Sequence, residues 1–276
     1  MQSATAPEGR PALEAAAAPE GGFDILRLGA VTAGHVANDA YMGFLYPLLP
    51  LLVEKHGLSL ALTGLLISSF NATGSLSQPL FGFYADKVRR RSFVVAGPVV
   101  TGLFVSGAGL APSYAVLLLL MVLGGLGSGC FHPAGITMAG LCSGRRRGLG
   151  LAVFVAGGRV GVAMGSALAT FLAARWGLEG SAWAVLVALA AGLLLWAASP
   201  PLGPPPPAEG RHLRGALANL GRARWPLFLL CSISVLRATV AVGMGAFLPL
   251  YFVERGASLA VAGASVSVFL FSGALG

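Results

Sequence analysis

The chain contains a series of apolar segments of about 20 residues, the length that a helix needs to cross the hydrocarbon core of a bilayer. They predict spanning helices at 26–53, 59–83, 92–110, 114–142, 148–174, 180–198, 226–253 and 258–276. Only 10% of the residues are charged, against roughly 25% in a soluble domain. So few charges cannot cover a water-facing surface. The sequence therefore predicts an all-α polytopic membrane protein.

Two polar segments divide the chain. Residues 1–24 are rich in Ala, Pro, Glu and Gly and predict a disordered N-terminal tail. Residues 199–224 combine a proline run with arginines and predict a cytoplasmic linker between a six-helix bundle, residues 25–198, and residues 225–276. The last predicted helix stops inside an apolar run at Gly276, which we interpret as a sign of C-terminal truncation.

The lysines and arginines are concentrated in alternate connections between the predicted helices. The basic connections hold Lys87, Arg89, Arg90, Arg91, Arg145, Arg146, Arg147, Arg211, Arg214, Arg222 and Arg224. The other connections hold only Lys55, Arg175 and Arg255. The positive-inside rule places the basic connections and the N-terminus in the cytoplasm. We therefore expect a multi-pass protein of the plasma membrane (the inner membrane of a bacterium). The net charge of +8 is then a topology signal, and nucleic-acid binding is not expected.

An internal repeat is the most informative pattern in the chain. Residues 57–76 (GLSLALTGLLISSFNATGSL) resemble residues 256–275 (GASLAVAGASVSVFLFSGAL), with Ser59 matching Ser258. The seventh and eighth predicted helices therefore repeat the first and second in the same orientation, six helices apart. Parallel six-helix repeats are the plan of major facilitator transporters. We expect that fold, with a six-helix N-terminal bundle and the first two helices of the C-terminal bundle.

Ionisable side chains inside the apolar segments are the candidates for chemistry. They are His35, Asp39, His132, Arg159 and Arg237. Each is costly in lipid, so each should face the bundle interior or a wet cavity. Burial favours the protonated form of a carboxyl and a nearby arginine favours the ionised form. Asp39 is therefore the candidate proton-coupling residue, with His35 one turn away. A purely structural hydrogen bond between these two is the alternative.

The remaining candidates are predicted to bind substrate. His35, Asn38, Asp39 and Tyr46 have the spacing of a single helix face. Arg237 corresponds to Asn38 in the repeat, so it should lie across the pseudo-two-fold axis, where it could pair with Asp39 or hold an anionic solute. His132 precedes a proline inside a helix and could bind solute, relay protons or simply pack. The predicted substrate-binding set is Asn38, Tyr46, Gln78, His132, Arg159 and Arg237.

Enzyme signatures are missing from the sequence. It contains no HExxH, GxSxG or P-loop pattern, and its three cysteines lack metal-ligand spacing. An intramembrane enzyme that uses Asp39 and His132 is an alternative. The lack of paired catalytic carboxylates and of a metal motif argues against it. We predict no enzymatic activity, no catalytic residues, no metal site and no cofactor other than a proton gradient.

Four short motifs resemble the fosmidomycin resistance protein branch of the major facilitator superfamily. They are residues 34–39 (GHVAND), 46–50 (YPLLP), 78–82 (QPLFG) and 131–133 (FHP). The resemblance extends from about residue 24 to the C-terminus. Where this branch would carry a neutral polar residue after paired glycines, the chain has Arg159, which points to a different or more anionic solute.

The superfamily also carries a loop motif, G-x-x-x-D-R-x-G-R-R, after its second helix. In this chain Lys87 replaces the first arginine and Arg89 replaces the second glycine. In the family the aspartate of this motif steadies one conformation through contacts with the other half. The resemblance therefore implies a gating loop of Gly82, Asp86, Lys87, Arg90 and Arg91.

The function implied by the resemblance is proton-coupled export of a small solute by alternating access, an anionic drug or metabolite being one candidate. The expected partners are that solute, protons and the lipid bilayer, and a separately encoded C-terminal segment is a further candidate. Two alternatives stay open: an importer of organic anions or sugars with the same fold, and a non-functional fragment of a truncated or split transporter gene.

Overall fold

The protein is a bundle of long helices. The computed structural model describes residues 22–85, 90–199 and 224–275. The helices are α1 (Ile25–His56), α2 (Leu60–Ala85), α3 (Arg90–Ser106), α4 (Tyr114–Cys142), α5 (Arg147–Trp176), α6 (Val185–Ala198), α8 (Arg224–Glu254) and α9 (Leu259–Leu275). Three short 3-10 segments join them: η1 (Gly107–Leu110), η2 (Gly144–Arg146) and η3 (Leu178–Ala184). Each predicted span is helical at its expected place in the described residues, although the first five residues of the sixth and the last four of the third are 3-10 rather than α.

Six helical segments of the described chain are long and apolar enough to cross a membrane. With η1 and η3 included, the segments of α3 and α6 each have 21 residues, whereas α9 has 17. α2 carries Asn71, Gln78 and several serines, which lower its hydropathy. The protein is therefore an all-α, multi-pass membrane protein. The predicted N-terminal tail and the predicted linker lie almost wholly outside the described residues.

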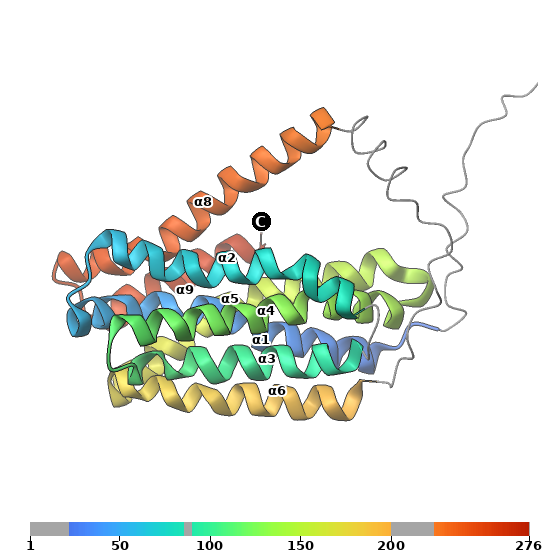
Figure 1. Ribbon diagram of the computed structural model, residues 1–276, viewed down its shortest axis with the longest axis horizontal. Helices are drawn as coiled ribbons and strands as arrows, with labels where there is room; N and C mark the ends of the chain where they lie inside the picture. The colour runs from blue at the N-terminus through green and yellow to red at the C-terminus, as the bar shows by residue number, and fades with distance from the viewer. Residues whose placement is uncertain (1–21, 86–89, 200–223, 276) are drawn as a thin grey trace, which may run out of the picture.

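α1 is the central helix of the N-terminal bundle. It packs most extensively on α5, while α4 packs on both α2 and α3 and α6 packs on α3 (Figure 1). A Cβ at Gly161 would overlap the backbone of Val36, and one at Gly165 would overlap the backbone of Ala40. These two glycines therefore allow close packing, which brings α5 directly against the face of α1 next to the ionisable residues.

The internal repeat is confirmed in the connections. Leu58 N donates to Val53 O after α1, and at the equivalent place after α8 Ala257 N donates to Phe252 O. Both turns use a glycine with positive φ, 61° at Gly57 and 81° at Gly256, a conformation that side chains disfavour.

Equivalent serines begin the next helix in each copy of the repeat. Ser59 Oγ accepts from Leu62 N at 3.2 Å, and Ser258 Oγ accepts from Val261 N at 3.4 Å. The two helix pairs therefore share a turn, residue by residue, as well as a sequence pattern.

α8 and α9 join the bundle at one end. α9 packs along α5, while α8 contacts α1 and α9 and tilts away from the other helices toward its own N-terminus (Figure 1). The buried residues of α8, which are Gly245, Ala246 and Pro249, all lie in its last third. The N-terminal bundle and the α8–α9 pair therefore meet at the end of the molecule where α1 and α8 finish. They diverge toward the end where α3, α5 and α8 begin with Arg90, Arg147 and Arg224.

Candidate functional site

A histidine–aspartate–histidine cluster joins α1 to α4. His35 Nε2 lies 3.1 Å from Asp39 Oδ2, and His132 Nε2 lies 3.3 Å from Asp39 Oδ1. His35 and Asp39 are one turn apart on α1, as the sequence predicted, and His132 reaches them from α4. We call these three residues the HDH cluster. His132, for which the sequence left solute binding, proton relay and simple packing open, lies directly against the candidate proton site.

The hydrogen bonds of the two rings define where protons can sit. His35 Nδ1 lies 2.7 Å from Phe154 O, and His132 Nδ1 lies 2.8 Å from Ser128 O. A carbonyl only accepts, so we assign the ring proton of each neutral histidine to Nδ1. Each Nε2 then turns a lone pair toward an Asp39 oxygen. Each Asp39–histidine contact becomes a hydrogen bond only when it holds one further proton. The HDH cluster therefore has room for two additional protons, one in each contact.

Asn38 holds the Asp39 carboxylate in place. Its Nδ2 donates to Asp39 Oδ1 at 3.0 Å and to Ser128 Oγ at 3.2 Å. Thr101 Oγ1 lies 3.2 Å from Asn38 Oδ1. Asn38 was predicted to bind substrate, but its side chain is buried and lies outside the described cavities. Its amide links α1, α3 and α4 around the carboxylate.

Aromatic rings and a glycine shape the space around His35. The Phe154 ring stacks on the imidazole at 4.1 Å between centroids, and the Phe131 ring lies at 5.7 Å. A Cβ at Gly158 would lie 2.6 Å from Asp39 Oδ2, so a larger residue at this position would displace the Asp39 or His35 side chain. His35 Nε2 is buried and has no aligned hydrogen-bond partner in the described chain. Asp39 is therefore the group that it faces.

A small cavity opens beside the HDH cluster. Its volume is about 360 Å³, and its lining includes His35, Asp39, Gln78, His132 and Arg159. Five of the predicted site residues thus line one space. A solute or water in this cavity can reach Asp39, which is the geometric requirement for a proton site that exchanges with the transport path.

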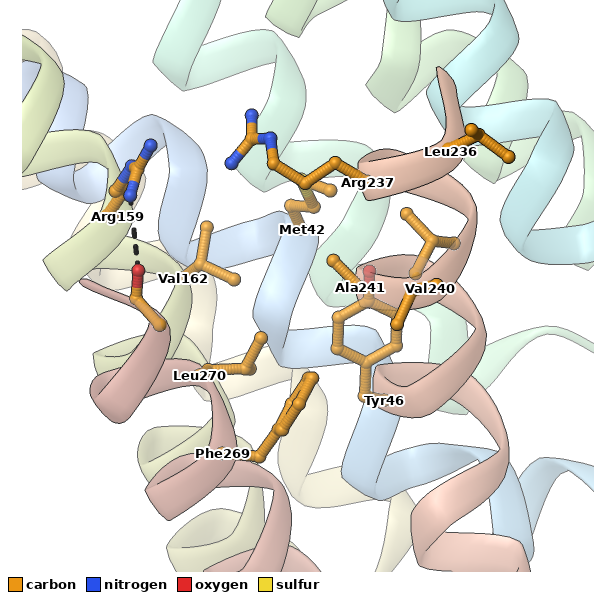
Figure 2. Close-up of a pocket in the computed structure, with 12 residues that line it drawn as sticks. Met42, Tyr46, Arg159, Val162, Leu236, Arg237, Val240, Ala241, Phe269 and Leu270 are labelled. Atoms are coloured by element: carbon orange, nitrogen blue, oxygen red, sulfur yellow. Dashed lines mark hydrogen bonds between the residues drawn. The ribbon is translucent and has the colours of Figure 1, made fainter. Parts of the chain in front are cut away.

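A larger cavity lies between the N-terminal bundle and the α8–α9 pair. Its volume is about 940 Å³, and α1, α5, α8 and α9 all contribute to its walls. In Figure 2, Arg237 extends from α8 across the cavity toward the α5 side, where Arg159 donates to Gly273 O at 3.1 Å. Tyr46 stands between Arg237 and Phe269, with its hydroxyl toward the arginine end. Arg237 therefore faces the larger cavity, and it forms no ion pair with Asp39 in the described structure.

Arg159 and Val162 line both cavities. They lie one turn apart on α5 and form the boundary between the HDH cluster and the larger cavity. Tyr46 lines only the larger cavity, whereas Gln78 lines only the smaller one. The predicted substrate residues other than Asn38 therefore divide between two adjoining spaces that share Arg159.

The predicted gating loop is only partly described. Asp86 and Lys87 lie outside the described residues. Arg91 donates to the Trp196 carbonyl and its guanidinium lies 5.8 Å from the centroid of the Trp196 ring, which ties α3 to α6. A Cβ at Gly82 would lie 3.5 Å from Pro133. These contacts show how α2, α3, α4 and α6 are held near the loop.

Several residues that complete the two sites were not predicted from the sequence. Thr101, Ser128 and the Phe154 carbonyl fix the HDH cluster, and Phe269 and Val162 line the larger cavity. These are small polar or apolar residues in apolar helices, so only the packing of the helices distinguishes them from their neighbours.

The HDH cluster also has donor types that suit a divalent metal. Its three donor atoms lie within 4.8 Å of one another, and imidazole with carboxylate is a common donor set for zinc. The sequence predicted no metal site. Experiments on the cluster therefore need a chelator control.

Comparison with known proteins decides the family. Residues 31–276 match the Major Facilitator Superfamily. The chain belongs to the major facilitator superfamily. It is 33% identical over 168 residues to the fosmidomycin resistance protein of Escherichia coli (strain K12), an alignment that covers 61% of this chain and 41% of that protein. The resemblance seen in the sequence motifs is confirmed.

Two further comparisons agree with this membership. The chain is 30% identical over 161 residues to the uncharacterized MFS-type transporter YfnC of Bacillus subtilis (strain 168), covering 58% of this chain and 39% of that protein. A solved structure of a peptide transporter POT in complex with alafosfalin has the same fold, with a TM-score of 0.54 at 20% identity, covering 82% of this chain and 50% of that one. The chain thus matches less than half the length of these curated relatives. The family is one of transporters rather than enzymes.

Proposed function

We propose that the chain performs proton-coupled export of a small solute by alternating access, with the HDH cluster as its proton site. The observation that carries the proposal is the placement of Asp39 between two histidine Nε2 atoms, within a helical bundle that spans a membrane. Ionisable groups at such depth are costly and usually mark a substrate or ion path.

The cluster links proton occupancy to helix packing. With one proton in each Asp39–histidine contact the cluster carries one positive charge, and loss of a single proton makes it neutral. If the lost proton is the one between Asp39 and His132, two lone pairs face each other at 3.3 Å and this hydrogen bond between α1 and α4 is gone, which leaves the Asn38–Ser128 hydrogen bond between the same helices. Proton release would therefore loosen this contact and favour a different arrangement of the helices.

The contacts between the two halves support an alternating-access mechanism. Ser267 Oγ donates to Ser166 Oγ at 3.1 Å between α9 and α5, and Gly245 packs against the Tyr46 ring. The N-terminal part of α8 makes no comparable contact (Figure 1). The bundle is therefore held at one end. Under the positive-inside rule its free end, which carries the basic residues, faces the cytoplasm.

An organic-anion importer of the same fold is a second candidate. The two arginines of the larger cavity favour an anion over an uncharged sugar. Import and export use the same proton site and differ in the direction in which solute moves relative to protons.

A drug-susceptibility assay tests the export proposal. Cells would express the 276-residue chain, alone and in its natural gene context, and fosmidomycin is the first compound because a relative is named for resistance to it. We expect protection by the wild type, loss of protection in Asp39→Asn, and retained protection in Glu179→Gln, an exposed acid in η3. A chelator should leave protection unchanged. Equal protection by Asp39→Asn and wild type would contradict the proton role. If the inserted wild type gives no protection, the export proposal for this drug is wrong.

A further inference from the structure

The larger cavity carries two positive charges that no acidic side chain of the described lining balances. Its charged lining groups are Arg159 and Arg237, and its described lining contains no carboxylate. Within the described residues, Arg159 donates to the Gly273 carbonyl alone. Arg237 forms no hydrogen bond or ion pair within the described chain. Because guanidinium groups in a membrane span are stabilised by anionic partners, this cavity is suited to receive one.

The acid nearest in the architecture is already engaged. Asp39 lines the neighbouring small cavity with Arg159, but its two oxygens face His35 and His132 and one of them also accepts from Asn38. The carboxylate is therefore held by three groups on α1 and α4, and the arginines remain available to a ligand.

The rest of the cavity is apolar. Phe269 and Leu270 of α9, Leu236 and Val240 of α8, and Met42 of α1 line it (Figure 2). Its polar side chains are the two arginines and Tyr46, whose hydroxyl points toward the arginine end. Against this apolar lining, most polar groups of a hydrophilic solute would have no hydrogen-bond partner. Each unpaired polar group would weaken binding. An apolar body would instead be buried by it.

We infer that the solute of the larger cavity is an amphipathic organic anion, with one phosphonate, sulfonate or carboxylate head and an aryl or alkyl body. The head would bind between Arg159 and Arg237, whose planar forks match such oxyanions, with Tyr46 as a further donor. The body would lie against Phe269 and Leu270. The volume of about 940 Å³ falls within the range of small-molecule sites. The inference rests on the proposed function, in that it takes this cavity as the solute site.

A competition series on the wild-type chain tests this assignment. The chain would be purified in nanodiscs of uncharged lipid, with no proton gradient, and incubated with radiolabelled 4-phenylbutylphosphonate. We expect saturable binding and competition by the unlabelled compound. We expect no competition by 4-phenylbutyltrimethylammonium, which has the same body with a cationic head. Methylphosphonate, which has the head alone, should compete at least about tenfold more weakly, because it buries no apolar body. Equal competition by the cation, or by methylphosphonate, would overturn the inference.

Variants test the residues separately. Arg237→Gln and Arg159→Gln should each weaken binding about tenfold, the scale of a lost charged hydrogen bond. Arg237→Lys should retain more affinity than Arg237→Gln. Arg255→Gln removes the same charge outside the cavity, where Arg255 lies over the Tyr251 ring, and should leave binding unchanged. Equal affinities in Arg237→Gln and Arg255→Gln would contradict the assignment.

The binding assay separates this inference from the proposed function. Asp39→Asn should bind 4-phenylbutylphosphonate like the wild type, because the measurement needs no proton movement. If binding follows the arginines while transport proves independent of protons, the proposed function fails and the solute class stands. If transport depends on Asp39 but the cation binds as well as the anion, the solute class fails and the proposed function stands.

Discussion

The helix pairs α1–α2 and α8–α9 have the same connection and opposite surroundings. Both pairs turn through a positive-φ glycine and begin the second helix at an equivalent serine. Yet 72% of the most apolar window of α1 is buried, against none of that of α8. α1 carries the acid of the HDH cluster, and α8 carries Arg237 at the position equivalent to Asn38. The two copies of the repeat therefore share the turn and differ in chemistry, with the proposed proton site on one copy and the proposed anion-binding group on the other.

The largest expected effect separates the chemistry of the two copies. Asp39→Asn should reduce gradient-driven transport to background, because an amide cannot carry the proton, while exchange of labelled for unlabelled solute continues. Arg237→Gln should weaken both processes by raising the solute concentration that they need about tenfold. Transport and exchange assays in proteoliposomes measure the two effects. A loss of exchange in Asp39→Asn, with the protein folded, would break the division between proton site and solute site.

Glycine-to-alanine changes test how differently α1 and α8 are packed, one at the α5 glycine that meets α1 and one on α8 itself. Gly161→Ala should destabilise the bundle by about 1–3 kcal/mol, because its Cβ would overlap the Val36 backbone. Gly243→Ala on α8 meets no atom within 4 Å and should be neutral or slightly stabilising. Thermal unfolding in detergent gives both values. Equal destabilisation by the two changes would mean that α8 is packed as closely as α1.

Asparagines on the two helices of the first copy provide a finer test. Asn38→Ala should lower coupled transport about tenfold, since it removes a hydrogen bond to the Asp39 carboxylate, and should change how transport depends on pH. Asn71→Ala removes only a bond to the Ile67 carbonyl and should leave that pH profile as it is. If both variants shift the profile alike, Asn38 does not position the carboxylate.

The smallest effect concerns what the two copies share. Ser59→Ala and Ser258→Ala each remove one N-cap acceptor and should each cost about 1 kcal/mol. Chemical denaturation of the two variants compares them directly. A clear cost at Ser59 with none at Ser258 would show that the equivalent turns are not equally formed.

Much of the fold could be predicted from the sequence, because lipid imposes strong rules on a spanning helix. Apolar length located the helices within a few residues, and the repeat placed α8 and α9 as equivalents of α1 and α2. Helical spacing also put His35 beside Asp39, and placed Tyr46 on the helix face that reaches the larger cavity.

The composition of the sites was harder to predict, since it depends on how separate helices pack. His132 meets Asp39 only because α4 packs against α1 at that depth. Asn38 shares the predicted face of α1, but the hydroxyls of Thr101 and Ser128 draw its amide into the core. A single periodic pattern cannot show which neighbouring helix meets each residue of a face.

The most direct test of the central claim is solute-driven proton movement in everted membrane vesicles, followed with a pH-sensitive dye. Wild type, Asp39→Asn and Glu179→Gln would be compared in the presence of a chelator. The account predicts that added solute dissipates an imposed pH gradient in the wild type and Glu179→Gln, and leaves it unchanged in Asp39→Asn. Dissipation by Asp39→Asn at the wild-type rate would contradict the assignment of the HDH cluster as the proton site.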